Sequence, residues 1–296
     1  MGARFAGRAG NCLPLMVSGT GDAMPIRYRL PVPSAQVKSA ILLAALQADG
    51  TTVVEEPQQS RDHTEVMIRG FGGELSVEGV CISVKGGQAL SGQEVRIPGD
   101  ISSAAFFLVA AALVPGSAVT IRNVGCNPTR NGIVEILRRM GASIEIFNQR
   151  AAAGEKVADF EVVGSKLNGI EVGAEWVART IDEYPILAIA AAVADGVTIF
   201  SDVKELRYKE SDRIAAMTEG LRILGVQVDE RADGMTIHGG ARLKGGAIRS
   251  FADHRVAMAF AVAALVSDAA VTIDDTACAA ISFPTFFALL EKICLQ

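Results

Sequence analysis

The sequence has few charged residues and no excess of positive charge. Charged side chains make up 21% of the 296 residues, the formal net charge is −5 and the isoelectric point is near 5.4. Nucleic-acid binding by a domain needs a broad basic surface, so a nucleic-acid partner is not expected. Any anion site must therefore be local.

Cysteine is scarce, and its spacing forms no motif. The five cysteines, Cys12, Cys81, Cys126, Cys278 and Cys294, are odd in number and include no Cys-x-x-Cys pair. This pattern argues against a disulfide framework and against structural zinc, and it is typical of a reducing compartment. We expect a cytoplasmic protein without a structural metal.

Long hydrophobic runs are also missing. The longest, AAFFLVAAALV from Ala104, is far shorter than the ~20 apolar residues of a membrane-spanning helix. The apolar run LPLMV near the N-terminus is shorter than a signal peptide needs. We expect no membrane partner, and the 50% hydrophobic residues instead predict a core large enough for two domains.

An internal repeat is the main feature that the sequence does contain. Four segments each have a polar start, an Ala-rich apolar stretch, a turn and a β-branched strand, beginning at Ser34, Ser102, Asp182 and Asp253. Helices that are apolar nearly all round must be buried. In three repeats an amphipathic helix, a Gly and a strand follow, from Arg61, Pro128 and Lys209. Duplicated helix–strand–helix–strand units predict an α/β fold.

The first and last repeats are incomplete. MGAR at positions 1–4 resembles the close of an amphipathic helix of this kind, and the final helix, from Ser282, has no Gly and strand after it. We expect a fragment of a longer protein; a native start at Met1 with a diverged repeat is the alternative.

Charged residues crowd the stretch KELRYKESDRIAAM from Lys204 to Met217. Lys209 and Arg213 are four apart and are predicted to share the first turn of one helix. There, like charges cost about 0.2–0.5 kcal/mol, and the helix dipole disfavours cations. A bound anion would explain this arrangement; a solvated helix face is the alternative.

Polar residues also open the other predicted helices: Ser34, Gln36, Arg61, Ser102, Ser103, Arg130, Asp182, Glu183, Asp253, His254 and Arg255. If the repeats pack side by side, these helix starts could converge on one anionic ligand. Simpler roles stay open for several of them. Ser34 and Asp182 could be helix caps, Arg61 could pair with Asp62, and His254 could be a core histidine.

The sequence resembles the 5-enolpyruvylshikimate-3-phosphate synthase family from about Met1 to Leu290, in the family's order. The resemblance lies in SAQVKSA, RDHTE, PGDISSAAFFLVAA, NPTR, DEYPILAIAAA, KESDR, DHRVAMAF and SFPTFF. It implies the two-domain, inside-out α/β barrel of enolpyruvyl transferases, in part. Residues 1–98 would be the remainder of one substrate domain, incomplete at its N-terminus, and residues 99–296 the second domain of repeated α/β units. Pro98-Gly99-Asp100 is the expected hinge.

The resemblance implies transfer of the enolpyruvyl group of phosphoenolpyruvate to the 5-hydroxyl of shikimate 3-phosphate, with release of phosphate. No metal or organic cofactor is implied. On matching positions, Ser34, Ala35, Gln36 and Arg61 would bind shikimate 3-phosphate, and Gln36 would also touch phosphoenolpyruvate.

The proposed chemistry needs a base, an acid and cations. The resemblance places Asp182 and Lys209 on either side of the reacting hydroxyl, as ligands of shikimate 3-phosphate. Addition needs a base at the hydroxyl and an acid at the methylene carbon, for which we predict Asp182 and Glu210. Arg213 and Arg255, with Glu210, are expected at phosphoenolpyruvate, since guanidinium groups bind carboxylate and phosphate bidentately.

Some features of the family are missing from this sequence. Its N-terminal Lys-Ser and Arg residues, its Gly-rich loop and its Arg-Pro-Met stretch do not occur here, and Ile281 stands where some members have Lys. We therefore expect little or no activity from this chain alone, and a complementary N-terminal segment is a candidate partner. Two alternatives stay open: a UDP-N-acetylglucosamine enolpyruvyl transferase, and a non-catalytic fragment.

Overall fold

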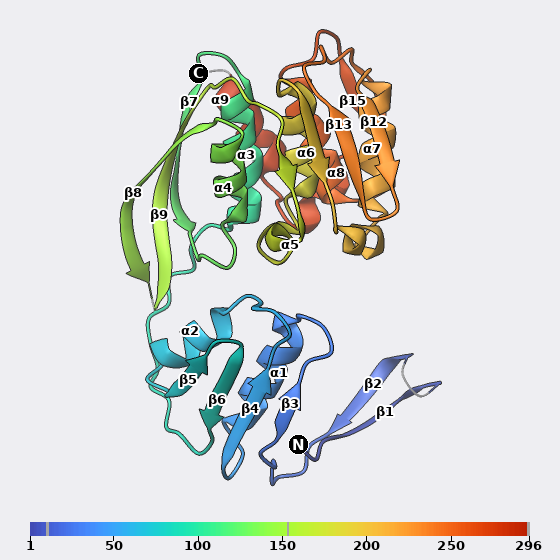
Figure 1. Cartoon of the computed structure of the whole chain (residues 1–296). Helices are drawn as coiled ribbons and strands as arrows, with labels where there is room; N and C mark the ends of the chain where they lie inside the picture. The colour runs from blue at the N-terminus through green and yellow to red at the C-terminus, as the bar shows by residue number, and fades with distance from the viewer. Residues whose placement is uncertain (10–11, 153, 295–296) are drawn as a thin grey trace. The chain divides into compact units, whose positions relative to one another are not determined.

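The computed structural model describes residues 1–9, 12–152 and 154–294 and divides into two compact units (Figure 1). Unit 1 comprises Met1–Ile97 and Ala151–Glu155, and unit 2 comprises Pro98–Arg150 and Lys156–Gln296. The short return of the chain to unit 1 at 151–155 has no signal in the sequence pattern. The assignment of residues 1–98 and 99–296 to the two domains of the family stays a prediction.

Unit 1 contains one complete repeat. Its sheet has the order β3-β4-β6-β5, with β3 and β4 parallel and the other neighbours antiparallel. The elements are β3 (Arg27–Arg29), α1 (Ala35–Ala45), β4 (Thr51–Glu55), α2 (His63–Gly70), β5 (Leu75–Glu78) and β6 (Cys81–Lys85). Leu42 on α1, Ile68 on α2 and Val54 on β4 share one small core, so both helices pack on the sheet.

A separate hairpin precedes this sheet in unit 1. Strands β1 (Arg4–Arg8) and β2 (Cys12–Ser18) pair antiparallel, and their apolar side chains are largely exposed; Leu13 is 75% exposed. The helix end predicted at positions 1–4 is not observed, since residues 1–3 have no helix and β1 begins at Arg4.

The described residues of unit 2 form three sheets. Their orders are β7-β9-β8, β10-β11-β13-β12 and β14-β15. The strands are β7 (Ala118–Gly125), β8 (Ser143–Ala152), β9 (Glu155–Val163), β10 (Glu171–Val172), β11 (Val197–Phe200), β12 (Gln227–Arg231), β13 (Gly234–His238), β14 (Gly246–Ile248) and β15 (Val271–Ile273). The second sheet repeats the pattern of unit 1: one parallel pair, then two antiparallel neighbours.

Three of the four predicted Ala-rich helices form the interior of unit 2. They are α3 (Ile101–Leu113), α6 (Tyr184–Val193) and α8 (His254–Ala264), which contact one another and are buried along almost their whole length. The fourth, α1 in unit 1, was wrongly predicted to be buried all round, since Val37 is 44% and Leu43 56% exposed. The other helices are α4 (Gly132–Arg139), α5 (Ala174–Thr180), α7 (Arg213–Ile223), α9 (Phe286–Cys294) and the short 3-10 helices η1 (Lys204–Tyr208) and η2 (Ala277–Ile281). Small alanine side chains let helices approach closely, and burying this apolar surface supplies most of the driving force for folding. The α/β class is confirmed.

The predicted helix starts are close to the observed ones. Ser34 caps α1 by accepting from Val37 N–H at 3.3 Å, and Asp253 caps α8 by accepting from Arg255 N–H at 2.9 Å. The placement of Lys209 in the first turn of α7 is wrong. Asp212 accepts from Ala215 N–H at 3.0 Å and so starts α7 at Arg213, which leaves Lys209 at the end of η1.

Candidate functional site

The starts of α6, α7 and α8 meet around one buried arginine in unit 2. Arg213, the first residue of α7, is 1% exposed. Its Nε donates to Asp253 Oδ2 at 2.8 Å, and its Nη2 donates to Glu210 Oε2 at 2.6 Å. Its Nη1 lies 3.9 Å from Asp182 Oδ1 and has no hydrogen-bond partner among the described residues. The guanidinium is therefore held on two sides and keeps one unused donor beside Asp182.

Asp253 holds this arginine in place. Its carboxylate is fully buried and accepts from Arg213, from the Ser211 hydroxyl at 2.9 Å and from the main chain of Arg255. Burial alone would raise the pKa of Asp253, but the hydrogen bonds and charge of Arg213, with those two further donors, keep its pKa below the ordinary value. The sequence placed Asp253 only among the polar residues that open the helices, whereas the structure shows it as the buried counter-ion of Arg213.

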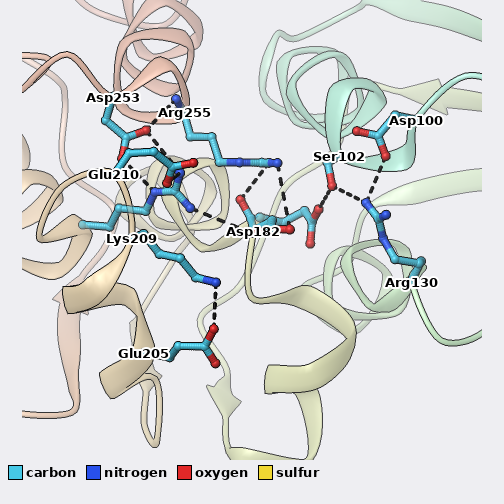
Figure 2. A network of polar contacts seen from close by, with 11 residues as sticks. Asp100, Ser102, Arg130, Asp182, Glu205, Lys209, Glu210, Asp253 and Arg255 are labelled. Atoms are coloured by element: carbon cyan, nitrogen blue, oxygen red, sulfur yellow. Dashed lines mark hydrogen bonds and ion pairs between the residues drawn. The ribbon is translucent and has the colours of Figure 1, made fainter. Parts of the chain in front are cut away.

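Arg255 reaches from α8 to Asp182, two residues before α6. Its Nη1 donates to the main-chain oxygen of Asp182 at 3.0 Å, and its Nη2 lies 4.0 Å from Asp182 Oδ2 (Figure 2). The neighbouring His254 is 6% exposed, and burial with the positive charge of Arg255 lowers its pKa. His254 is therefore neutral near pH 7, as expected of a core histidine.

Lys209 and Glu210 lie at the more open side of this cluster. Lys209 Nζ pairs with Glu205 Oε1 at 2.7 Å, and its side chain is 23% exposed. The Glu210 side chain is 50% exposed although its Oε2 accepts from Arg213. Both groups can therefore meet a ligand without a change in the buried Arg213–Asp253 pair.

A second polar network joins the starts of α3, α4 and α6. Arg130 Nη2 donates to Ser102 Oγ at 2.7 Å and to Asp100 Oδ1 at 2.9 Å, and the Ser102 hydroxyl donates to Glu183 (Figure 2). Burial raises the pKa of Glu183, while the Ser102 hydrogen bond and the charges of Arg255 and Arg130 act in the opposite direction.

The other predicted ligand residues lie in unit 1. Ser34, Ala35 and Gln36 stand at the start of α1, with Gln36 exposed, and Arg61 precedes α2. Lys38 Nζ on α1 pairs with Glu65 Oε1 on α2 at 2.7 Å, and Ser39 Oγ lies 2.5 Å from Thr64 Oγ1. These bonds lie within two turns of both helix starts, so the two starts are neighbours.

The whole chain matches known proteins closely. Residues 1–290 match the family model of EPSP synthase (3-phosphoshikimate 1-carboxyvinyltransferase). The 3-phosphoshikimate 1-carboxyvinyltransferase of Geobacter sulfurreducens is 52% identical, with 100% of this chain and 69% of that protein covered. A solved EPSP synthase structure from Acinetobacter baumannii superposes with a TM-score of 0.92 at 45% identity, over 99% of this chain and 68% of that chain.

The chain belongs to the EPSP synthase family. The predicted resemblance and the enolpyruvyl transferase fold are thereby confirmed. The chain is a transferase of the shikimate pathway, and the UDP-N-acetylglucosamine alternative is not favoured. It spans about two thirds of the length of these EPSP synthases.

The predicted site residues of this chain fall into two groups. Asp182, Glu210, Arg213 and Arg255 are joined by direct contacts within unit 2, with Lys209 next in sequence to Glu210. The Ser34–Gln36 group and Arg61 lie in unit 1, so a single ligand region shared by both groups stays a prediction. Among the described residues, no group of His, Cys, Asp and Glu side chains could hold a metal ion, and no helix is both long and apolar enough to cross a membrane.

Sequence reasoning missed how the cluster is supported. Asp253, Ser211 and Glu183 form buried or half-buried bonds to the predicted site residues or to their helix starts. The sequence does show that polar residues stand close to the predicted site residues. Glu183 follows Asp182, Asp253 lies two residues before Arg255, and Ser211 lies within KESDR. These positions do not show which residue each carboxylate contacts. Asp253 bonds Arg213, 40 residues away in the sequence, and Glu183 bonds Ser102, 81 residues away.

Proposed function

We propose that this EPSP synthase transfers the enolpyruvyl group of phosphoenolpyruvate to shikimate 3-phosphate with the helix-start cluster of unit 2. The observation that carries the proposal is the buried Arg213 guanidinium, whose Nη1 has no hydrogen-bond partner among the described residues and lies beside Asp182. Leaving a buried donor unpaired costs about 1–3 kcal/mol. An anionic substrate that accepts from Nη1 removes this cost.

The chemistry divides between the residues of the cluster. In the addition step, Asp182 takes the proton of the attacking hydroxyl as its oxygen bonds to phosphoenolpyruvate, and Glu210 delivers a proton to the methylene carbon. In the elimination, Glu210 removes a proton from the resulting methyl group, the C–O bond to phosphate breaks, and phosphate leaves with the proton that Asp182 held. Arg213 and Arg255 bind the carboxylate and phosphate of phosphoenolpyruvate, and Lys209 holds the acceptor sugar together with Asp182. The half-exposed Glu210 side chain supports its role, because it can meet both ligand and solvent.

Unit 1 would contribute the remaining contacts to shikimate 3-phosphate. Ser34, Ala35 and Gln36 lie at the start of α1 and Arg61 lies before α2. A helix start offers free N–H groups and a positive dipole end to a phosphate. The neighbouring starts of α1 and α2 support this assignment, and Gln36 would also touch phosphoenolpyruvate.

A complementary N-terminal segment is proposed as a partner in this activity. Within the described residues, β15 pairs with β14 alone, whereas the corresponding strands β4 and β11 each have an antiparallel neighbour on the other side. A strand edge left open in this way is a template for pairing with another segment. The cysteine pattern of the sequence supports a cytoplasmic location.

The test measures phosphate release from phosphoenolpyruvate in the presence of shikimate 3-phosphate, with and without an N-terminal segment from a related enzyme. We expect release only with the segment, and a loss of about 10²-fold or more in Asp182→Asn. Arg255→Ala should raise the KM for phosphoenolpyruvate. Arg249→Ala is its matched control, because Arg249 is 65% exposed and pairs loosely with Glu219 at 3.8 Å.

Each outcome has a clear meaning. Robust turnover by the chain alone would contradict the need for a segment. Unchanged turnover in Asp182→Asn would contradict the role of Asp182, and equal effects of the two arginine variants would contradict the phosphoenolpyruvate site.

A further inference from the structure

Glu183 precedes α6 but does not cap it. Its side chain makes no hydrogen bond to the first turn of the helix among the described residues, although the free N–H groups there are natural partners for a carboxylate. Instead, Glu183 Oε1 accepts from the Ser102 hydroxyl on α3. Both side chains are almost fully buried, with Glu183 2% and Ser102 1% exposed. The carboxyl group therefore joins two helices.

The direction of the hydrogen bonds in this network is fixed. Arginine can only donate, so Ser102 Oγ accepts from Arg130 Nη2 at 2.7 Å and must use its own proton toward Glu183. The other proton of the same nitrogen serves Asp100 at 2.9 Å. A hydroxyl polarised by a guanidinium is a strong donor, and this holds the Glu183 carboxyl in one orientation.

Packing alone does not account for a carboxyl group at this position. A buried carboxyl costs free energy that an apolar side chain of similar size would not. Burial accordingly raises the pKa of Glu183, against the pull of the Ser102 hydrogen bond and the two arginine charges.

The residue directly before Glu183 is the proposed base. The main-chain oxygen of Asp182 accepts from Arg255 at 3.0 Å, and its carboxylate lies 3.9 Å from Arg213 and 4.0 Å from Arg255. The Asp182–Glu183 peptide is thus held at its carbonyl oxygen by Arg255 and at its N–H by the main-chain oxygen of Thr180, at 2.9 Å. The Glu183 side chain adds the bond to Ser102 on α3.

We propose that Glu183 is a positioning residue: its bond to Ser102, which Arg130 holds in turn, fixes the start of α6 and sets the Asp182 carboxylate against Arg213 and Arg255. The inference rests on the proposed role of Asp182 in binding shikimate 3-phosphate. A displacement of ~1 Å in a reacting group can reduce a rate by about 10²-fold, so a residue that touches no substrate can control the reaction.

Ser102→Ala is the gentlest test, because it removes the donor with little change in volume. Ser103→Ala is the matched control on the next residue of α3. We expect Ser102→Ala to weaken shikimate 3-phosphate binding by about tenfold, the value of one lost hydrogen bond. Titration calorimetry should show that Ser102→Ala does not weaken shikimate 3-phosphate binding further when Asp182→Ala is already present. Glu183→Gln, which keeps an acceptor, should bind more like the wild type than Glu183→Ala.

The double-mutant cycle of Ser102→Ala and Asp182→Ala separates a positioning role from a general structural effect. Equal weakening by Ser102→Ala with and without Asp182 would overturn the inference, as would no weakening at all. Binding is measured with the N-terminal segment present. If Asp182→Ala itself leaves binding unchanged, or the chain with the segment does not bind shikimate 3-phosphate, the proposed function of Asp182 fails. The role of the Ser102–Glu183 bond in fixing the start of α6 is then tested by amide hydrogen exchange at residues 182–187. Exchange that is equal in Ser102→Ala and Ser103→Ala overturns it.

Discussion

At the scale of single residues, the pKa values of two buried carboxyl groups of unit 2 are shifted in opposite directions. Asp253 meets Arg213, Ser211 and a main-chain N–H, which outweigh its burial and lower its pKa from 3.8. Glu183 has the Ser102 hydroxyl as its nearest donor, and burial prevails and raises its pKa from 4.5. The number and charge of the donors decide which effect wins.

These shifts predict opposite pH dependences of stability. The lowered pKa of Asp253 contributes stability above pH 3.8, which is lost as the pH falls through its folded-state pKa. The raised pKa of Glu183 contributes stability below pH 4.5, which is lost as the pH rises through its folded-state pKa. Urea unfolding from pH 3 to 8 should therefore show the wild-type advantage growing with pH relative to Asp253→Asn and shrinking relative to Glu183→Gln. Two difference curves of the same slope would show that one assignment is wrong.

At the scale of elements, α7 and α8 approach each other so closely that one position must be glycine. A Cβ added to Gly220 on α7 would lie 2.2 Å from Cζ of Phe260 on α8, with two more ring carbons within 2.9 Å. Phe260 is fully buried. The ring is therefore enclosed by the protein, and a methyl group at position 220 would overlap with it.

We predict that Gly220→Ala destabilises unit 2. Overpacking costs typically about 1–3 kcal/mol, which exceeds the gain of about 1 kcal/mol that alanine brings to a helix. Chemical denaturation gives the free energy of unfolding. Phe260→Leu makes room for the methyl group, so the double variant should be more stable than the sum of the two single effects. Simple additivity would refute the close contact.

The same contact explains part of the geometry of the helix-start cluster in unit 2. α7 and α8 carry Arg213 and Asp253 at or next to their first residues, and these side chains meet at 2.8 Å. Close packing of the two helices fixes the distance between their starts. The geometry of the cluster is therefore a result of interhelix packing and not of the local sequence KESDR alone.

At the scale of the whole molecule, the two units have separate cores of very different size. In unit 1, Lys38 Nζ lies 2.9 Å from Glu56 and 2.7 Å from Glu65, and its side chain is 1% exposed. Removing one partner of a buried ion pair leaves uncompensated charge. Lys38 thus supports the unit with the smaller core.

We predict that Lys38→Ala lowers the stability of unit 1 by about 3–5 kcal/mol and leaves unit 2 unchanged. Hydrogen exchange resolved by segment should show faster opening in residues 27–85 and no change in α3, α6 and α8. Lys166→Ala is the matched control, because Lys166 pairs with Asp195 at 2.7 Å but is 80% exposed. Its stability should match the wild type. Faster exchange throughout the chain would mean that the two units unfold as one.

The sequence by itself determined the repeats, the α/β class, the three Ala-rich helices buried in unit 2 and the residue types at the helix starts. These features follow from hydrophobic periodicity, capping residues and glycine turns, which act over a few residues. The motifs in KESDR and DHRVAMAF also pointed to the family. The start of α7 was placed wrongly, because Asp212 rather than an earlier residue caps it, and the helix end expected at positions 1–4 is not observed, since strand β1 begins at Arg4.

The tertiary structure alone decided the partners. Arg213 meets Asp253 across 40 residues and Ser102 meets Glu183 across 81, and Gly220 is confined by a ring on another helix. No local pattern encodes such pairs, because they depend on how the buried helices pack. A buried charge then takes whichever partner that packing brings within hydrogen-bond distance, since leaving it unpaired costs more than any local preference supplies.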